Sequence, residues 1–289
     1  MTTPALQQPY VHIPDTVSQE AQAFLRTLLD PALMPAFPKP DDVAGWEKVR
    51  AFAEADGKVT VYTHGGAHVM YSAASTLGRA VVFAHATGLR VLSVDYTVAP
   101  LAKYNQMSDE VVDAISALLK NGQRLADTAI YGDSSGGGLA AAVVLKMRDQ
   151  GLGMPAAAVL VSPCLDVTPS CDTETTLHDA DPNQLYEKHG KQAAGAFATP
   201  ADQKDPYASP VYGDYSKGFP PTLIQGGLKE TLLSGFVRLY QALDVAGVPV
   251  KLDLYEGMIH NFQDRIPDVP EAISARRKMR MFVHQYLGM

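Results

Sequence analysis

The sequence contains few cysteines and no long apolar run, and each scarcity removes a class of protein. Its only cysteines, Cys164 and Cys171, make neither a disulfide framework nor a metal-ligand cluster. Cys164 lies in an apolar stretch and is expected to be a buried, unreactive thiol. No apolar segment approaches the roughly 20 residues that span a membrane. Met1 to Glu20 lacks a basic segment followed by an apolar core, so we expect no signal peptide and a cytoplasmic protein without a membrane partner.

Positive charge is also in deficit. Lys and Arg number 24 against 31 Asp and Glu, which gives a formal net charge of −7. Such a chain repels polyanions, so nucleic acid is not expected as a partner. The 46% hydrophobic and 19% charged residues are ordinary for a globular protein. A length of 289 residues suits one large α/β domain with an attached cap, or two smaller domains.

Apolar strand segments alternate with helical segments along most of the chain. The predicted strands are Val59–Tyr62, Arg90–Val94, Thr128–Tyr131, Ala156–Val161, Pro221–Gln225 and Val250–Tyr255. The predicted helices are Leu77–Thr87, Ser108–Leu119, the segment that begins near Leu139, Leu232–Ala246 and Glu271–Tyr286. Nearly continuous apolar strands that alternate with helices are typical of a parallel sheet buried on both faces.

Two regions fall outside this alternation. Near the N-terminus, an amphipathic helix is predicted over Val17–Leu29, and a second helix over Val43–Ala55 follows a proline-rich break. From about 168 to 205 the sequence is polar and irregular, with short helical pieces near 184–197. We therefore expect N-terminal cap helices in residues 1–43 and a catalytic domain over residues 44–289. The irregular stretch, residues 168–205, is named the cap insertion.

A glycine-rich turn joins one predicted strand to the helix after it. Tyr131 is followed by Gly-Asp-Ser-Ser-Gly-Gly-Gly, so that Ser134 stands at the centre of a Gly-x-Ser-x-Gly pattern. Between a strand and a helix this pattern is typical of a nucleophile elbow, a sharp turn that raises a serine hydroxyl at the helix N-terminus. No lysine follows the glycines, as a phosphate-binding loop requires, and their spacing does not fit a dinucleotide-binding turn.

A serine nucleophile needs a base and an acid that orients the base. His260 follows the last predicted strand, where open α/β sheets place their sites, and is the expected base. Glu230 is the only carboxylate in the loop that follows the preceding strand, and is the expected acid. Asp253 is its nearest competitor but lies inside a strand. The order Ser134, Glu230, His260 is the chain order of an α/β-hydrolase triad.

The turn after the first predicted strand is expected to supply donors for an oxyanion. Gly65, Gly66 and Ala67 offer backbone amides there, and the amide of Ser135 offers another. His68 shares this turn with His64, but the intervening glycines disfavour a helix and no acidic partner is near. No metal site is therefore expected.

Seven segments together resemble the hormone-sensitive-lipase-like, or bacterial family IV, branch of the α/β-hydrolases. They are His64-Gly65-Gly66, Asp95 to Pro100, Gly132 to Gly137, Asp205 to Pro210, Pro220 to Ile224, Ala246 to Val250 and Tyr255 to His260. The resemblance covers the chain from about Val59 to the end. It implies an α/β-hydrolase fold, with Gly66, Ala67 and Ser135 as the oxyanion donors.

The chain departs from this family in four places. Ala67 stands where the family has glycine, and Glu230 where many members have aspartate. His68 stands beside the expected acyl site, at a position that is usually aromatic or apolar, and is a candidate substrate-binding residue. The family also has an antiparallel strand pair before this turn, whereas Ala36–Lys58 shows no strand alternation. Either the sheet edge is trimmed or a piece of sequence is missing.

The residues and the resemblance predict a carboxylic ester hydrolase that forms an acyl-enzyme and needs no cofactor. Short- to medium-chain esters are the substrates that the resemblance implies, and a small-molecule ester is the expected partner. A lactonase or a deacetylase with the same triad remains open, as does a homodimer. A non-catalytic receptor of the gibberellin-receptor kind is disfavoured because such receptors lose the histidine, and an intact triad argues against a partner protein with a vestigial site.

Overall fold

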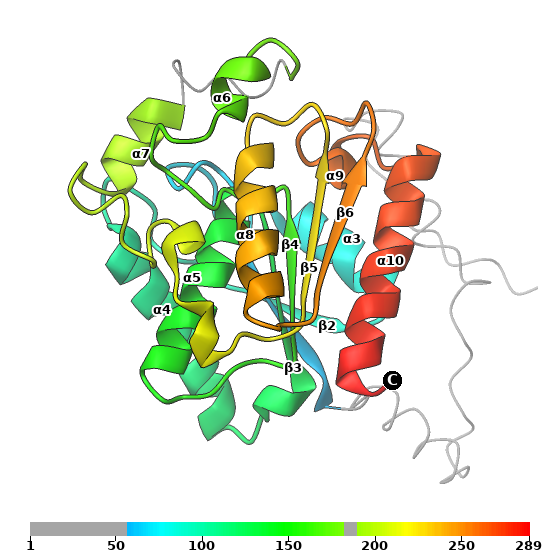
Figure 1. Ribbon diagram of the computed structural model, residues 1–289. Coiled ribbons are helices and arrows are strands. Elements are labelled where there is room, and N and C mark those ends of the chain that lie inside the picture. Colours follow the sequence, from blue (N-terminus) through cyan, green and yellow to red (C-terminus); the bar gives the residue numbers. More distant parts are fainter. Residues whose placement is uncertain (1–56, 182–189) are drawn as a thin grey trace, which may run out of the picture. The chain divides into compact units, whose positions relative to one another are not determined.

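A parallel sheet forms the centre of the described chain (Figure 1). The computed structural model describes residues 57–181 and 190–289. The strands are β1 (Val59–Thr63), β2 (Arg90–Ser93), β3 (Thr128–Asp133), β4 (Ala157–Val161), β5 (Thr222–Gly227) and β6 (Val250–Tyr255). They lie in the order β2-β1-β3-β4-β5-β6, and every pairing is parallel. Their carboxyl ends therefore share one edge of the sheet.

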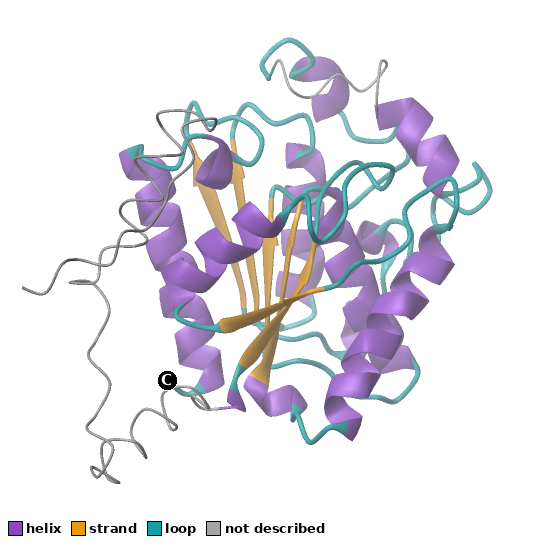
Figure 2. Cartoon of the chain, turned by 180° about the vertical axis from the view of Figure 1, so that it is seen from behind, coloured by secondary structure: helices purple, strands orange, loops and turns teal. Residues whose placement is uncertain are grey.

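Helices cover both faces of this sheet (Figures 1 and 2). The longer ones are α3 (Leu77–Thr87), α4 (Tyr104–Lys120), α5 (Ser135–Asp149), α8 (Leu233–Val245) and α10 (Pro270–Leu287). Short ones are η3 (Leu125–Asp127), α6 (Thr173–Thr176), α7 (Lys191–Phe197), η5 (Pro210–Tyr212), η6 (Tyr215–Lys217) and α9 (Phe262–Arg265). Helices α4, α5 and α8 pack on one face, and α3 and α10 on the other. Within the described ranges, no helix is both long and apolar enough to cross a membrane.

Strand β4 shows why both faces are covered. Ala158 and Leu160 belong to the core under α5 and α8, whereas Ala157, Val159 and Val161 belong to the core under α10. All five residues are fully buried. Successive side chains of a strand point to opposite faces, so an unbroken apolar run requires an apolar partner on each side. The prediction of a doubly covered parallel sheet is confirmed.

The predicted elements differ from the observed ones mainly at their ends. Helix α4 begins at Tyr104 rather than at the predicted Ser108. Ser108 is buried inside the helix, where its hydroxyl donates to the carbonyl of Asn105 at 2.8 Å and accepts from Lys146 Nζ at 3.1 Å. The Ser108 hydroxyl thus bonds backwards within the helix and does not mark its start.

The cap insertion lies between β4 and β5, where its helices α6 and α7 stand beyond the carboxyl ends of the strands (Figure 1). The predicted helices Val17–Leu29 and Val43–Ala55, the whole of the N-terminal cap at 1–43, and residues 182–189 lie outside the described residues. So does most of Ala36–Lys58, the segment without strand alternation. Strands β2 and β6 form the two edges of the described sheet.

Candidate active site

Ser134 occupies a sharp turn between β3 and α5. Its backbone has φ 54° and ψ −126°, a left-handed conformation that is costly for a residue with a side chain. A Cβ on Gly136 would lie 2.1 Å from the carbonyl oxygen of Thr63 and 2.4 Å from that of His64, so no larger residue fits there. The strand–turn–helix context predicted for the glycine-rich motif is therefore present, and it lifts the Ser134 hydroxyl at the helix N-terminus.

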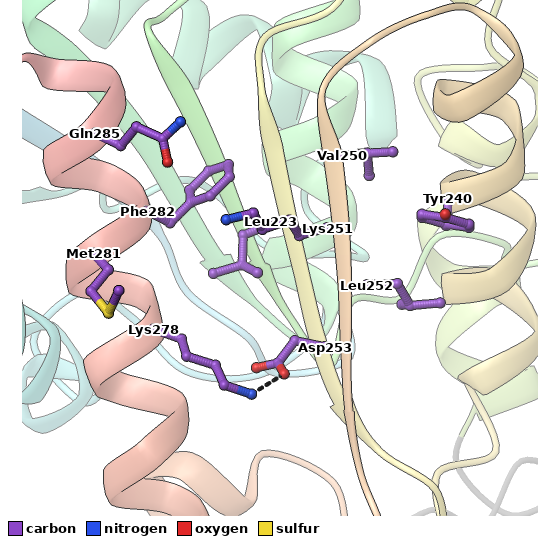
Figure 3. Close-up of a pocket in the computed structure, with 10 residues that line it drawn as sticks. All are labelled: Leu223, Tyr240, Val250, Lys251, Leu252, Asp253, Lys278, Met281, Phe282 and Gln285. Carbon is purple, nitrogen blue, oxygen red and sulfur yellow. Dashed lines mark hydrogen bonds and ion pairs between the residues drawn. The ribbon is translucent and has the colours of Figure 1, made fainter.

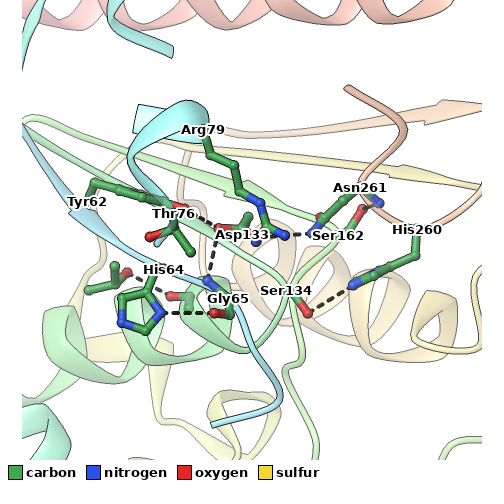
Figure 4. A network of polar contacts seen from close by, with 12 residues as sticks. Tyr62, His64, Gly65, Thr76, Arg79, Asp133, Ser134, Ser162, His260 and Asn261 are labelled. Carbon is green, nitrogen blue, oxygen red and sulfur yellow. Dashed lines mark hydrogen bonds and ion pairs between the residues drawn. The ribbon is translucent and has the colours of Figure 1, made fainter. Parts of the chain in front are cut away.

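The three residues predicted to form a triad meet at the carboxyl edge of the sheet. His260 Nε2 lies 2.9 Å from Ser134 Oγ, and His260 Nδ1 lies 2.7 Å from Glu230 Oε2. Figure 4 shows the imidazole directed at the serine hydroxyl. His260 is 6% exposed and Glu230 is fully buried. The arrangement can pass a proton from the hydroxyl to the imidazole while the carboxylate faces the opposite nitrogen.

The second oxygen of Glu230 is held by two donors that sequence reasoning did not identify. Oε1 accepts from the Ser162 hydroxyl and from the Gly227 amide, both at 2.7 Å. Ser162 Oγ in turn accepts from the Asn261 amide at 3.1 Å. A buried carboxylate is tolerated when donors satisfy its oxygens, and these donors also fix its direction. In the sequence, the feature that could have pointed to Ser162 is the Ser-Pro pair directly after β4.

Asp133, the residue before the nucleophile, is the centre of a buried hydrogen-bond network (Figure 4). It accepts from Tyr62 Oη at 2.6 Å, Arg79 Nη1 at 2.6 Å, the Gly65 amide at 3.0 Å and Asn261 Nδ2 at 2.9 Å. These donors come from β1, α3, the turn after β1 and the loop after β6. One carboxylate thus ties the nucleophile elbow to the oxyanion turn and to the loop of the histidine.

The negative charge of Asp133 also shifts the pKa values of neighbouring side chains. Burial and then the negative charge of Asp133 raise the pKa of Asp264 to about 7. Burial and Asp133 also raise the pKa of the Tyr62 phenol far above its usual range, so that the phenol stays a donor. The Arg79 guanidinium is the cation that faces the Asp133 carboxylate.

The amide of Gly65 is directed at Asp133 and not at the reacting side of the serine. We therefore correct the prediction that Gly65 donates to an oxyanion. Gly65 lies in the glycine turn, and the sequence alone does not show which amide of that turn points inward.

Gly66, Ala67 and His68 follow in an unusual backbone path. Their φ values are 136°, 53° and 64°, all in the left-handed region. A Cβ on Gly66 would lie 2.3 Å from the carbonyl oxygen of Met70. Within the described part of the chain, no residue accepts a hydrogen bond from the amides of Gly66, Ala67 or Ser135. These amides are therefore available to a ligand.

His68 is buried under the cap insertion. The residue is 4% exposed, and its ring stacks on Phe197 of α7 with the ring centroids 3.7 Å apart. Burial, with a smaller effect of His64, lowers the pKa of His68 to about 3. Neither ring nitrogen has a hydrogen-bond partner among the described residues. The structure thus places a neutral imidazole between the oxyanion turn and the cap.

His64 has a structural environment. Its ring stacks on Tyr96 with centroids 4.3 Å apart, and Nδ1 lies 2.9 Å from the carbonyl oxygen of Gly65. Burial lowers the pKa of His64 as well. Across residues 57–181 and 190–289, no group of three or more His, Cys, Asp or Glu side chains is arranged to hold a metal ion.

Asp253, the rejected competitor for the acid, is engaged elsewhere. It forms an ion pair with Lys278 and accepts from Gln225 Nε2 at 2.8 Å. It also lines a hollow on the outer side of β6, between α8 and α10, whose lining includes none of the triad residues (Figure 3). This hollow belongs to the sheet edge rather than to the chemistry.

The two cysteines take no part in the site. Cys164 was predicted to be buried but is only partly buried, and Cys171 is buried. Burial raises the pKa of both thiols, which disfavours the reactive thiolate.

Comparison with known proteins agrees with this geometry. The family described as alpha/beta hydrolase fold matches residues 60–264. An esterase of Acinetobacter venetianus is 34% identical over 79% of this chain and 75% of that protein. An acetyl-hydrolase of Streptomyces hygroscopicus is 33% identical over 82% of this chain and 78% of that protein. A solved esterase of the bacterial hormone-sensitive lipase family has a TM-score of 0.77 at 33% identity, covering 81% of this chain and 78% of that one.

The chain belongs to the α/β-hydrolase fold family, in its hormone-sensitive-lipase-like esterase branch. The resemblance and the fold class predicted from sequence are both confirmed. As a member of this branch, the protein is an enzyme of the serine carboxylesterase class.

Proposed function

We propose that the protein hydrolyses carboxylic esters through Ser134, His260 and Glu230. The observation that carries the proposal is the continuous chain of contacts from the serine hydroxyl through both imidazole nitrogens to a buried carboxylate. Ser134 Oγ attacks the ester carbonyl carbon while His260 Nε2 takes the hydroxyl proton. Glu230 accepts from Nδ1, holds the imidazole in the required tautomer and stabilises its cationic form.

The tetrahedral intermediate then collapses. The carbon–oxygen bond to the alcohol breaks, and His260 gives its proton to the departing oxygen, which leaves an acyl group on Ser134. Water attacks this acyl group with His260 again as the base, and the acid product leaves with the serine hydroxyl restored. The chemistry assigned here is completed by these side chains and water.

The negative oxygen of each intermediate is assigned to the amides of Gly66, Ala67 and Ser135. What supports this is the absence of an acceptor for them among the described residues and the position of Ser135 directly after the nucleophile. Donors fixed before the reaction need no reorganisation when charge develops, and each is typically worth about 10²–10³ in kcat.

Short acyl chains are the proposed substrates. The oxyanion turn lies under α7, where His68 is stacked against Phe197, so the residue expected beside the acyl group is already covered by a buried aromatic contact. An acetyl-hydrolase among the relatives points to the same size of acyl group. The proposed partner is therefore a small-molecule ester, and the unpaired cysteines are compatible with a cytoplasmic location.

The test is hydrolysis of nitrophenyl esters of graded chain length, with a lactone and an acetylated amine in parallel. Ser134→Ala should lower kcat by about 10⁶ and abolish labelling by a fluorophosphonate probe, with the melting temperature nearly unchanged. Normal turnover by folded Ser134→Ala protein would refute the assignment. Faster turnover of the lactone or the amine than of any ester would replace the ester as substrate while keeping the triad.

A further inference from the structure

The cap insertion makes direct hydrogen bonds to the loops that carry the acid and the base. Thr173 of α6 donates through Oγ1 to the carbonyl of Thr231, the residue after Glu230, at 2.6 Å. Thr173 Oγ1 also accepts from the Ser234 amide at 3.0 Å. Asp172 accepts from the Ser234 hydroxyl at 2.7 Å. The start of the cap insertion is thus bonded to the loop after β5 and to the first turn of α8.

Asp181 makes the corresponding contact to the base. Its side chain is completely buried, and Oδ2 accepts the backbone N–H of His260 at 2.6 Å. A short bond from an amide to a carboxylate is charge-assisted and stronger than one between neutral groups. The peptide of the histidine is therefore anchored by a residue that belongs to the cap insertion rather than to the sheet or its covering helices.

The place of the hydrogen bond between Asp181 and the His260 amide determines which part of the site it can affect. His260 lies in the loop after β6, and the next residue, Asn261, has a left-handed backbone with φ 54°. Asn261 is held by Ser162 through its amide and by Asp133 through its side chain. Asp181 fixes the peptide immediately before these two contacts. Together they set the direction of the Cα–Cβ bond of the histidine, and so the place of its ring.

We propose that Asp181 is a positioning residue through which the cap insertion sets the His260 imidazole against Ser134. The inference rests on the proposed triad, because it concerns the placement of its base. Without the Asp181 bond, the peptide before His260 loses this anchor, and the ring, which also faces Glu230, is held less firmly at 2.9 Å from Ser134 Oγ. Misplacement of a catalytic group by about 1 Å can cost about 10²-fold in rate. The loss should therefore fall on kcat rather than on KM.

The experiment compares Asp181→Ala, Asp181→Asn and the full-length wild type on a short nitrophenyl ester. Asp181→Ala removes the acceptor and should lower kcat about 10- to 100-fold, with KM changed less than about threefold. Asp181→Asn keeps an oxygen that can accept from the amide and should recover most of the lost kcat. Asp179→Ala is the matched control, because Asp179 lies in the same segment but its side chain is 85% exposed and pairs with the exposed side chain of His178.

Labelling of Ser134 by a fluorophosphonate should slow in parallel with kcat, since it reports the activated hydroxyl without the ester-binding step. Wild-type kcat in folded Asp181→Ala, a loss confined to KM, or equal losses in the Ala and Asn variants would overturn the proposal. If Asp181→Ala does not fold, Asp181→Glu takes its place. It displaces the carboxylate by one methylene and should lower kcat about tenfold at nearly constant KM, and wild-type kcat would overturn the proposal.

The proposed function can fail separately. If wild-type protein shows neither ester turnover nor labelling that depends on Ser134, the triad assignment is wrong whatever the Asp181 variants do. If the wild type is active and Ser134→Ala is not, the triad stands and the Asp181 variants decide the cap inference alone.

Discussion

Single residues at this site accept conformations that their side chains disfavour. Ser134, Ser162 and Asn261 all have φ near 50°, and Ala67 joins them in the oxyanion turn. Such backbone strain costs of order 1–3 kcal/mol for each residue and persists only where the surroundings enforce it. At Ser162 and Asn261 the enforcing contacts are the hydrogen bonds that hold the acid and the base. Strain and catalytic geometry therefore occur in the same residues.

Ala67 offers a test of the cost of this backbone strain. At φ 53° its methyl group costs about 1–2 kcal/mol, whereas glycine there would cost somewhat less than 1 kcal/mol of chain entropy. Ala67→Gly should therefore raise Tm by about 2 °C and change kcat only modestly, since the amide is kept. Ala67→Pro deletes the N–H, and its ring cannot adopt a positive φ. We expect that variant to lose about 10²–10³ in kcat.

Thermal melts and steady-state kinetics on the same preparations check both expectations. Full activity in a folded Ala67→Pro protein would show that this amide does not face the oxyanion, which would then rest on Gly66 and Ser135.

His68 makes stability depend on pH. Because burial holds its pKa at about 3, the folded protein keeps it neutral while the unfolded chain takes up a proton below its ordinary value of 6.5. The unfolded state binds more protons between these values, so the free energy of unfolding falls as pH is lowered through this window. In this window the free energy of unfolding falls by up to about 1.4 kcal/mol for each pH unit. The stabilising contribution of the neutral, buried imidazole is fully present above pH 6.5.

His68→Phe keeps a ring against Phe197 and removes the titration. Its free energy of unfolding, measured by urea titration from pH 7 to 4.5, should fall less steeply than that of the wild type. His85→Gln, at an exposed position of α3, serves as the control and should follow the wild-type curve. Parallel curves for His68→Phe and the wild type would contradict the prediction.

At the scale of elements, the site is a set of strand ends held in register. Parallel pairing brings the carboxyl ends of β3, β4, β5 and β6 to one edge, and each contributes a residue there: Ser134, Ser162, Glu230 and His260. The loops are then joined by side-chain bonds rather than by further strand pairing. A substitution in one loop should therefore alter the positions of residues in the neighbouring loop.

Two carboxylates, Glu230 in the loop after β5 and Asp253 within β6, are expected to differ in role. Glu230→Ala leaves His260 Nδ1 without its partner and should lower kcat by about 10³–10⁴ with a smaller effect on KM. Asp253→Asn removes an ion pair with a half-exposed lysine and should be nearly neutral in rate. Steady-state kinetics of both variants test this assignment. A large loss of kcat in Asp253→Asn together with almost none in Glu230→Ala would mean that the acid has been misassigned.

At the scale of the whole molecule, the cap insertion closes over the carboxyl edge of the sheet and reaches three parts of the site. It bonds to the acid loop through Thr173, to the base through Asp181 and stacks on the oxyanion turn through Phe197. A cap attached in this way would limit the space around the acyl group and the freedom of the proposed triad.

Preference for short chains follows from this attachment. We expect kcat/KM for C2 to C4 nitrophenyl esters to exceed that for C12 to C16 esters by roughly tenfold or more, because the buried contact between His68 and Phe197 has to open for a long chain. Phe197→Ala should shift the optimum toward longer chains. A rate that climbs steadily from C4 to C16 in the wild type would refute the prediction.

The sequence by itself determined the sheet and the nucleophile elbow, and it predicted the three residues proposed as the triad. Each of these depends on contiguous residues: apolar runs for the buried strands, small residues around Ser134 for the elbow, and chain order after β5 and β6 for Glu230 and His260. Local patterns of this kind survive whatever the rest of the chain does. Their errors were confined to element ends, as at Ser108 in α4.

Only the tertiary structure decided which hydrogen bonds join the loops of the site to one another. Asp133 reads in the sequence as an unspecified position of the serine motif, and Asp181 as one polar residue in an irregular cap. Both are buried acceptors whose donors lie far away along the chain, at Asn261 and His260. The Gly65 amide points at a carboxylate for the same reason. The partner of a buried polar group depends on which loop ends meet in space, and no local pattern of residues records that meeting.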